Sequence, residues 1–159
     1  YLLTISALGV AVVNIVRLVG WYHRGIWQKP LLWSLYIAFL GMCVSFVLYA
    51  LQPWLGYNHS IAVHGLSISG IGMMTVAMMA RVSLGHTGRS IHQPPKIVNA
   101  MFALMAVAFV SRVFLPLIDM SHYLLWIMLA QSAWIACFAL FCISYLPILA
   151  RPRPDGLFG

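Results

Sequence analysis

The sequence predicts an all-α protein, a polytopic membrane bundle of about five transmembrane helices. Hydrophobic residues make up 63% of its 159 residues and charged residues only 7%, whereas an ordinary soluble domain has about 25% charged residues. The apolar residues also form five runs, each close to the roughly 20 residues with which a helix crosses a hydrocarbon core about 30 Å thick. These observations exclude a soluble globular domain and make the lipid bilayer the first expected partner.

The five predicted spans follow one another through short connections. No connection is long enough for a soluble domain, so we expect a single transmembrane helical domain over residues 1–159, with neighbouring helices antiparallel. The first residue is Tyr1 rather than methionine, and we expect the chain to be a fragment of a longer one. The predicted spans are residues 2–19, 31–51, 60–80, 97–117 and 122–149.

Prolines mark the ends of these spans. Proline lacks a backbone N–H, so it is best tolerated where a helix begins or ends. Pro30 and residues 94–95 precede the second and fourth spans, Pro53 follows the second, and Pro116 and Pro147 fall near the ends of the fourth and fifth. We therefore expect the helices to end near these positions.

The basic residues predict the orientation of the bundle. Lys and Arg are enriched in cytoplasmic connections, and eight of the nine bases fall in the first connection, the third connection and the tail. We therefore expect the N-terminus outside and the C-terminus in the cytoplasm. The net charge of +7 then reflects orientation and lipid phosphates, and we expect no nucleic acid partner. These eight bases are Arg17, Arg24, Lys29, Arg81, Arg89, Lys96, Arg151 and Arg153.

The ninth base, Arg112, lies inside the fourth predicted span. A guanidinium at membrane depth costs about 2.5 to 3.5 kcal/mol on insertion scales, so it should face the bundle and find an acceptor. Three partners are open: the outer lipid headgroups, Asp119 two helical turns further on, and the carboxylate of a bound cofactor. Arg112 is thus a candidate cofactor-binding residue.

Six histidines are candidate metal ligands, because neutral imidazole binds metals and haem iron. His64 and His86 are 22 residues apart, and the helical part of that stretch alone spans roughly 25 Å, so they cannot bind one metal atom. We expect two candidate sites, one on each side of the membrane. The outer histidines are His59, His64 and His122, and the inner ones are His23, His86 and His92.

Small residues follow His64 along one face of the third span. Gly65, Ser69 and Gly72 are spaced four and three residues apart. Such a stripe allows the close approach of another helix or of a flat macrocycle. This neighbourhood favours a ligand role for His64 over that of an ordinary hydrogen-bonded histidine.

The third connection begins with an unusual segment, residues 81–89. We expect a loop in which Gly85 and Gly88 provide backbone conformations closed to other residues. His86 would be presented between them, while Arg81 and Arg89 supply positive charge. The Lys-Ser/Thr ending and preceding strand of a phosphate-binding P-loop are absent, so the alternatives are a ligand site and a structured turn.

Three segments of the sequence resemble the NnrS family of bacterial membrane proteins. The first is HGLSISGIGMMTVAMMARVSLGHTGR, residues 64–89. Its flanks are RLVGW with PLLW upstream, residues 17–21 and 30–33, and YLPILARPRPDG near the end, residues 145–156. The resemblance covers nearly the whole chain.

The resemblance implies a multi-pass protein of the bacterial inner membrane that contains haem and copper and protects cells against nitric oxide. Family members are similar to twelve-helix proteins, so this chain would be their C-terminal five helices, with the remaining helices or another membrane subunit as partners. His64 and His86 match the family's histidine positions, and Arg81 and Arg89 its flanking arginines. Tyr36 departs from the pattern, since many members have a histidine there. That departure puts copper at the inner site in doubt.

We therefore expect a haem-binding and copper-binding protein of nitrosative-stress tolerance, with nitric oxide as its small-molecule ligand. His64 is the expected haem ligand, Arg112 a partner of a haem propionate, and His86 the ligand of an inner metal. No acid/base pair is visible, so we expect a binding protein rather than an enzyme. Two rivals stay open: a channel or transporter half without cofactor, and a metal-free assembly module.

Overall fold

The computed structural model describes residues 2–156, and the secondary structure of this part of the chain consists of helices, without strands. Five stretches are long and apolar enough to cross a membrane. They are formed by α1 (Leu2–Gly20), α2 (Pro30–Leu55), α3 to α4 (Ser60–His86), α5 to α6 (Ile97–Ile118) and α7 (Tyr123–Ala150). The all-α membrane fold is confirmed.

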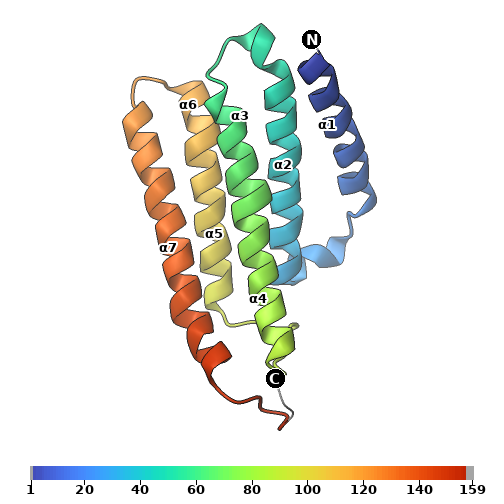
Figure 1. Ribbon diagram of the computed structural model, residues 1–159, viewed down its shortest axis with the longest axis vertical. Helices are drawn as coiled ribbons and strands as arrows, with labels where there is room; N and C mark the ends of the chain where they lie inside the picture. Colours follow the sequence, from blue (N-terminus) through green and yellow to red (C-terminus); the bar gives the residue numbers. More distant parts are fainter. Residues whose placement is uncertain (1, 157–159) are drawn as a thin grey trace.

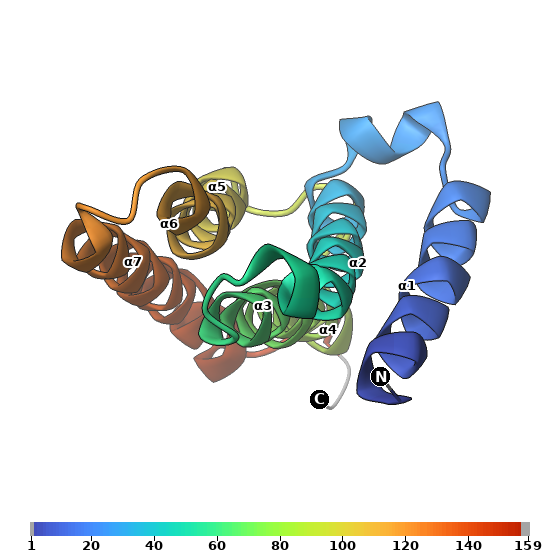
Figure 2. The ribbon, with the colours of Figure 1, turned by 90° about the horizontal axis from the view of Figure 1, so that it is seen from above.

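The helices run side by side along the long axis of the bundle (Figure 1). α1 begins at one end of the bundle and α7 finishes at the other. Seen from above, α2, the α3–α4 helix, the α5–α6 helix and α7 form one group, while α1 stands at its edge (Figure 2). α1 packs against α2 and is joined to it by the short 3₁₀ helix η1 (Arg24–Gln28).

All five membrane helices extend beyond their predicted ends, three of them by a single residue. α2 continues through Pro53 to Leu55, and α7 continues through Pro147 to Ala150. A proline in the last turns of a membrane helix removes one hydrogen bond, which neighbouring groups replace. The third helix continues past residue 80 to His86, so the expectation that residues 81–86 form a loop was wrong.

Two of the membrane helices contain π-helical turns. The first, η2 (Leu66–Met73), lies between α3 (Ser60–Gly65) and α4 (Met74–His86), and the second, η3 (Val110–Phe114), lies between α5 (Ile97–Phe109) and α6 (Leu115–Ile118). Pro116 is the second residue after η3. Because proline lacks an N–H and crowds the carbonyl four residues earlier, we attribute the widened turn in η3 to it.

The small-residue stripe brings helices into close contact, as predicted. A side chain at Gly65 would collide with Ser45 Oγ of α2 and come within 3.3 Å of Val113, and a Cβ at Gly41 would lie 2.6 Å from Ser69 Cβ. The buried hydroxyls of Ser45 and Ser69 donate to the carbonyls four residues earlier, at 2.7 and 2.6 Å. The contact between α2 and the third helix is therefore tight and leaves these two hydroxyls satisfied.

The main apolar core is formed by residues of five elements, which are α2, η2, α4, α5 and α7. It lies on the side of the bundle toward the C-terminal ends of α4 and α7, so the opposite end of the bundle is left for a polar site. Its buried members are Leu31, Ala38, Met73, Val76, Ala77, Ala80, Leu84, Val98, Met101, Phe102, Met105, Cys137 and Tyr145.

Candidate functional site

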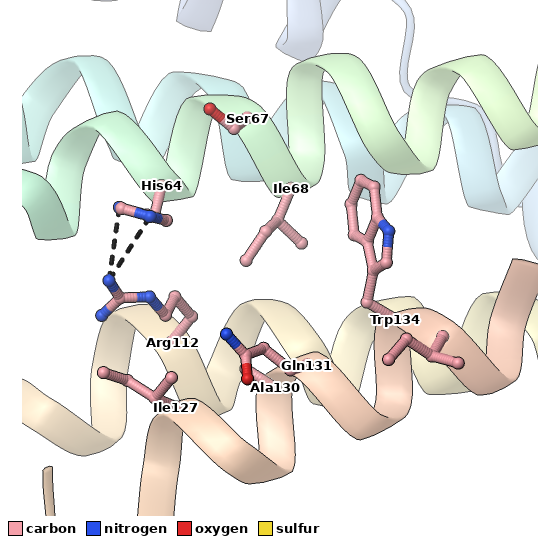
Figure 3. Close-up of a pocket in the computed structure, with 9 residues that line it drawn as sticks. His64, Ser67, Ile68, Arg112, Ile127, Ala130, Gln131 and Trp134 are labelled. Atoms are coloured by element: carbon pink, nitrogen blue, oxygen red, sulfur yellow. Dashed lines mark hydrogen bonds between the residues drawn. The ribbon is translucent and has the colours of Figure 1, made fainter. Parts of the chain in front are cut away.

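A pocket of about 470 Å³ opens between the third helix and α7 (Figure 3). This volume falls in the range of about 300 to 1,000 Å³ usual for small-molecule and cofactor sites. α3 and η2 form one wall, α7 forms the other, and η3 contributes one arginine. The lining residues are His64, Ser67, Ile68, Arg112, Ile127, Ala130, Gln131, Trp134 and Ile135.

Arg112 and His64, predicted separately, meet in this pocket. Arg112 is only 8% exposed, and its Nη2 lies 3.4 Å from both Nδ1 and Nε2 of His64. Its Nη1 donates to the Tyr123 hydroxyl at 3.1 Å, and its guanidinium carbon lies 5.5 Å from the centre of the Tyr123 ring. The guanidinium is therefore held between a histidine and a tyrosine.

Asp119 is not the partner of Arg112, so that alternative was wrong. Its Oδ1 accepts hydrogen bonds from the backbone N–H of Ser121, at 2.9 Å, and from the Ser121 hydroxyl, and its Oδ2 lies 2.7 Å from Nδ1 of His122. These hydrogen bonds, that of the Ser121 hydroxyl first, lower the pKa of Asp119 to about 2. Asp119 has extended backbone angles at the end of α6, which takes its side chain off the helix that carries Arg112.

Within residues 2–156, no carboxylate neutralises Arg112. The sequence contains two acidic residues, Asp119 and Asp155. Asp119 pairs with His122, and Asp155 pairs with Arg153 at 2.6 Å. The described part of the chain therefore holds a buried cation beside an open pocket without a protein anion to match it.

His64 is oriented by its own helix. Its Nδ1 lies 2.7 Å from the carbonyl oxygen of Ser60, one turn earlier. Since a carbonyl only accepts, Nδ1 carries the proton, and the lone pair of Nε2 faces Nη2 of Arg112 at 3.4 Å. A backbone carbonyl on one nitrogen is the usual support for an imidazole that binds a metal through the other.

The segment 81–89 caps the inner end of α4. Gly88 is left-handed (φ 67°), the N–H of Arg89 donates to Leu84 O at 2.9 Å, and the N–H of Gly88 donates to Gly85 O at 3.3 Å. These two bonds and the left-handed glycine make a Schellman cap. Gly85 is helical, so only one of the two glycines has the conformation that the sequence predicted.

Two arginines tie the cap to the end of α7 and to the C-terminal tail. Arg89 Nη1 donates to Ile148 O at 3.1 Å, and Arg153 Nη1 donates to His86 O at 3.1 Å. Arg153 also donates two hydrogen bonds to the Asp155 carboxylate, from Nε at 2.9 Å and from Nη2 at 2.6 Å. This pairing raises the pKa of Arg153. The Gly-His-Thr-Gly-Arg segment therefore has a clear structural role.

A sequence model of the NnrS family, described as NnrS protein, matches residues 1–153. The chain belongs to the NnrS family. No curated protein and no solved structure matches it. Membership and the five apolar helices make it a multi-pass membrane protein and suggest a role in the nitric oxide response.

We call the pocket lined by His64 and Arg112 the outer pocket, after the orientation that the sequence predicts. The other candidate histidines of the NnrS chain lie outside it. The His59 ring packs edge-on against Tyr49, 4.8 Å between centres, and His122 contacts Asp119 and the Trp126 ring. In the part of the chain that the structure covers, no three or more His, Cys, Asp or Glu gather as a metal site would need. Of the three outer histidines, His64 lines the pocket.

His86 lines a second, shallower pocket of about 310 Å³ at the inner end of the NnrS chain. Met78, Arg81, Val82, Gly85 and Ile91 line it too. Tyr36, which departs from the family pattern, packs elsewhere, with its ring 6.0 Å from those of Tyr22 and Trp27. Arg81 and His86 thus share a pocket, while Arg89 binds the last turn of α7.

Sequence reasoning missed two lining residues of the NnrS pocket, Gln131 and Trp134, and also Tyr123, which holds Arg112 beside the pocket. Tyr123, Gln131 and Trp134 all come from α7, whose apolar residues show no face that would single them out. Only a polar residue inside the apolar run, Gln131, offered a signal. Tyr123 and Trp134 look like ordinary aromatic residues of a membrane helix until α7 is placed beside α3 and η3.

Proposed function

We propose that the outer pocket binds haem and that the protein contributes to nitric oxide tolerance in the inner membrane of a bacterium. In this proposal His64 is the iron ligand through Nε2, and Arg112 binds a haem propionate. The remaining helices of a longer protein, or another membrane subunit, complete the assembly around the pocket.

The observation that carries the proposal is the buried, unmatched charge of Arg112. Arg112 is 8% exposed, and neither acid of the sequence reaches it among residues 2–156. Removing a guanidinium from water is costly unless an anion compensates it. A carboxylate in the adjoining pocket would be that anion, and an Arg–carboxylate pair forms strong charge-assisted hydrogen bonds.

The surroundings of His64 suit an iron ligand. The Ser60 carbonyl holds the proton on Nδ1, and the contacts of Arg112 with the ring, at 3.4 Å, are longer than the usual 2.7 to 3.2 Å of a good hydrogen bond. Iron binding to Nε2 would require the guanidinium to move off the ring toward the propionate, and these long contacts would be lost at little cost. Haem iron bound there would supply the capacity to bind nitric oxide.

The pocket offers one protein ligand to such an iron. His64 is its single histidine, and no cysteine, methionine or tyrosine is among the described lining residues. Apolar side chains, Ile68, Ile127 and Trp134, form much of the rest, and they would exclude water from the haem. With His64 as its single protein ligand, a bound haem would supply iron that can also bind nitric oxide.

The described residues do not by themselves fit a copper site. Met78 and His86 line the inner pocket and offer a thioether and an imidazole, ligands that suit Cu(I). Arg81 lines the same pocket, and its positive charge opposes a bound cation. Copper binding by His86 would need further ligands from outside residues 2–156.

The test is an optical spectrum with iron analysis of the protein purified from membranes, for wild type, His64→Ala and His92→Ala. His92 is an exposed histidine of the inner connection and serves as the matched control. We expect haem absorbance and bound iron in wild type and His92→Ala, and their loss in His64→Ala together with lower growth under nitric oxide. A colourless, iron-free wild type would overturn the proposal and favour the channel or the metal-free module.

A further inference from the structure

The outer pocket has two unlike ends (Figure 3). His64 and Arg112 face each other at one end, and Trp134 closes the other. Ile68 lies between them on the wall formed by η2. A ligand that fills the pocket therefore meets charge at its outer end and an aromatic wall at its inner end.

Trp134 is seated directly on the backbone of Gly72. A Cβ at position 72 would collide with Cζ3 and Cη2 of the indole and would lie 2.8 Å from Met105 Cε. Real Cβ atoms do not approach other heavy atoms this closely, so the absence of a side chain is what admits the ring. On its other side, Trp134 packs against Phe138, with 5.0 Å between ring centres.

We propose that Gly72 is the specificity-determining residue of the pocket, because it seats Trp134 and so sets how far a ligand reaches toward the membrane centre. This inference rests on the proposed function. Gly72 follows His64 by eight residues, about 12 Å along the helix at about 1.5 Å per residue. The ligand class is an amphipathic acid, with its carboxylate at Arg112 and an apolar body that ends at Trp134.

A methyl group at position 72 would displace the indole of Trp134. Met105 Cε also lies against that position, and Phe138 packs on the indole, so the ring cannot keep its present place. Because Trp134 lines the pocket, its displacement changes the end of the pocket while His64 and Arg112 stay unchanged.

The experiment compares Gly72→Ala with Gly70→Ala. A Cβ at Gly70 meets Met42 Cγ at 3.5 Å, which is ordinary van der Waals contact, so this variant adds the same methyl group to the same π-helical turn without touching Trp134. The first measurement is fluorine NMR of the haem-free protein labelled with 5-fluorotryptophan, with the resonance of Trp134 assigned by Trp134→Phe. We expect that resonance to shift in Gly72→Ala and to stay in place in Gly70→Ala.

The second measurement is haem affinity by optical titration. One misplaced methyl group in a close-fitting pocket changes affinity by about tenfold or more, so we expect such a loss in Gly72→Ala and no loss in Gly70→Ala. The double variant Gly72→Ala with Trp134→Phe should recover affinity, because phenylalanine lacks the outer indole ring that meets the new methyl group. The fluorine spectrum of Gly72→Ala, with its other tryptophan resonances in their wild-type places, shows that the loss is not one of folding.

The outcomes separate the inference from the function on which it rests. If wild type binds no haem in the titration, the proposed function fails. If wild type binds haem and Gly72→Ala binds it as Gly70→Ala does, with an unmoved Trp134 resonance, the inference is overturned and the proposed function stands. If Gly72→Ala loses haem affinity and Trp134→Phe does not restore it, the inference is also overturned, because the Trp134 indole would not be the cause of the loss.

Discussion

Arg112 and His64 are 48 residues apart in the chain, yet Arg112 Nη2 lies 3.4 Å from each ring nitrogen of His64. The two residues come from antiparallel neighbours, η3 and α3. Arg112 lies within one π-helical segment, and His64 lies two residues before the other. Such turns are frequent at functional sites. The contact joins a buried cation and a potential iron ligand at one end of one pocket.

The first prediction concerns the charge of Arg112. Arg112→Gln keeps a hydrogen-bonding group and removes the charge, so it should weaken haem binding. A hydrogen bond to a charged group contributes about 1.5 to 3 kcal/mol, which is on the order of tenfold or more in affinity. The measurement is optical titration with haem, and Arg24→Gln, an exposed arginine of η1, is the control. Equal affinities of the two variants would show that Arg112 does not hold the propionate.

The second prediction concerns Tyr123, which accepts from Arg112 at 3.1 Å. Tyr123→Phe keeps the ring beneath the guanidinium and removes the acceptor. Because a buried donor is then left without a partner, we expect the free energy of unfolding of the haem-free protein to fall by about 1 to 3 kcal/mol. Thermal or denaturant unfolding in detergent measures this. Tyr22→Phe, at an exposed tyrosine, should leave stability unchanged, and a similar value for both would contradict the prediction.

Much of the fold could be predicted from the sequence, because membrane helices are governed by apolar length and by charge at their ends. The ends of helices were less predictable. Pro53 and Pro147 indicate ends only where their missing hydrogen bond cannot be replaced, and the helices here continue for two and three residues beyond them. Residues 81–86 contain glycine and charge, yet nothing in them prevents helical backbone.

The sequence identified the two main residues of the site, but it did not predict that they contact each other. Arg112 was singled out by its charge at membrane depth and His64 by its chemistry and small neighbours. Seven residues separate Arg112 from Asp119, which suggests one helix face, but the π turn and the extended backbone of Asp119 remove that alignment. Trp134 was not predictable, because its role depends on the position of Gly72 across the helix interface.

The third prediction concerns the Schellman cap. Gly88 is left-handed, and a Cβ there would also lie 2.7 Å from Oδ2 of Asp155. Gly88→Ala should therefore lower the free energy of unfolding by about 1 to 2 kcal/mol and loosen the tail from the cap. At Gly85, in contrast, a Cβ meets nothing within 4 Å, and alanine suits helical backbone better than glycine by about 1 kcal/mol.

The pair makes a matched comparison, because both glycines belong to the same short segment. We expect Gly85→Ala to unfold at the same or a higher temperature than wild type, and Gly88→Ala at a lower one. Limited proteolysis of the tail reports the same contact, and cleavage should be faster in Gly88→Ala. If Gly85→Ala were the more damaging variant, the cap would not hold the tail as the structure indicates.

The fourth prediction concerns the outer loop and its dependence on pH. The pKa of Asp119 is lowered to about 2, first by the hydrogen bond from the Ser121 hydroxyl and next by that from His122. A carboxyl whose pKa is lower in the folded state stabilises that state above its unfolded pKa, near 3.8, and this contribution is lost as pH falls through the folded pKa. The stability difference between wild type and Asp119→Asn should therefore be fully present above about pH 5 and decline between about pH 4 and pH 2.

This stability difference is measured from the unfolding temperatures of both proteins between pH 7 and pH 2. Ser132→Ala, at an exposed site on α7, is the control, and its stability difference from wild type should not change over this pH range. A pH-independent difference for Asp119→Asn would mean that the Asp119 carboxylate is not stabilised by these hydrogen bonds.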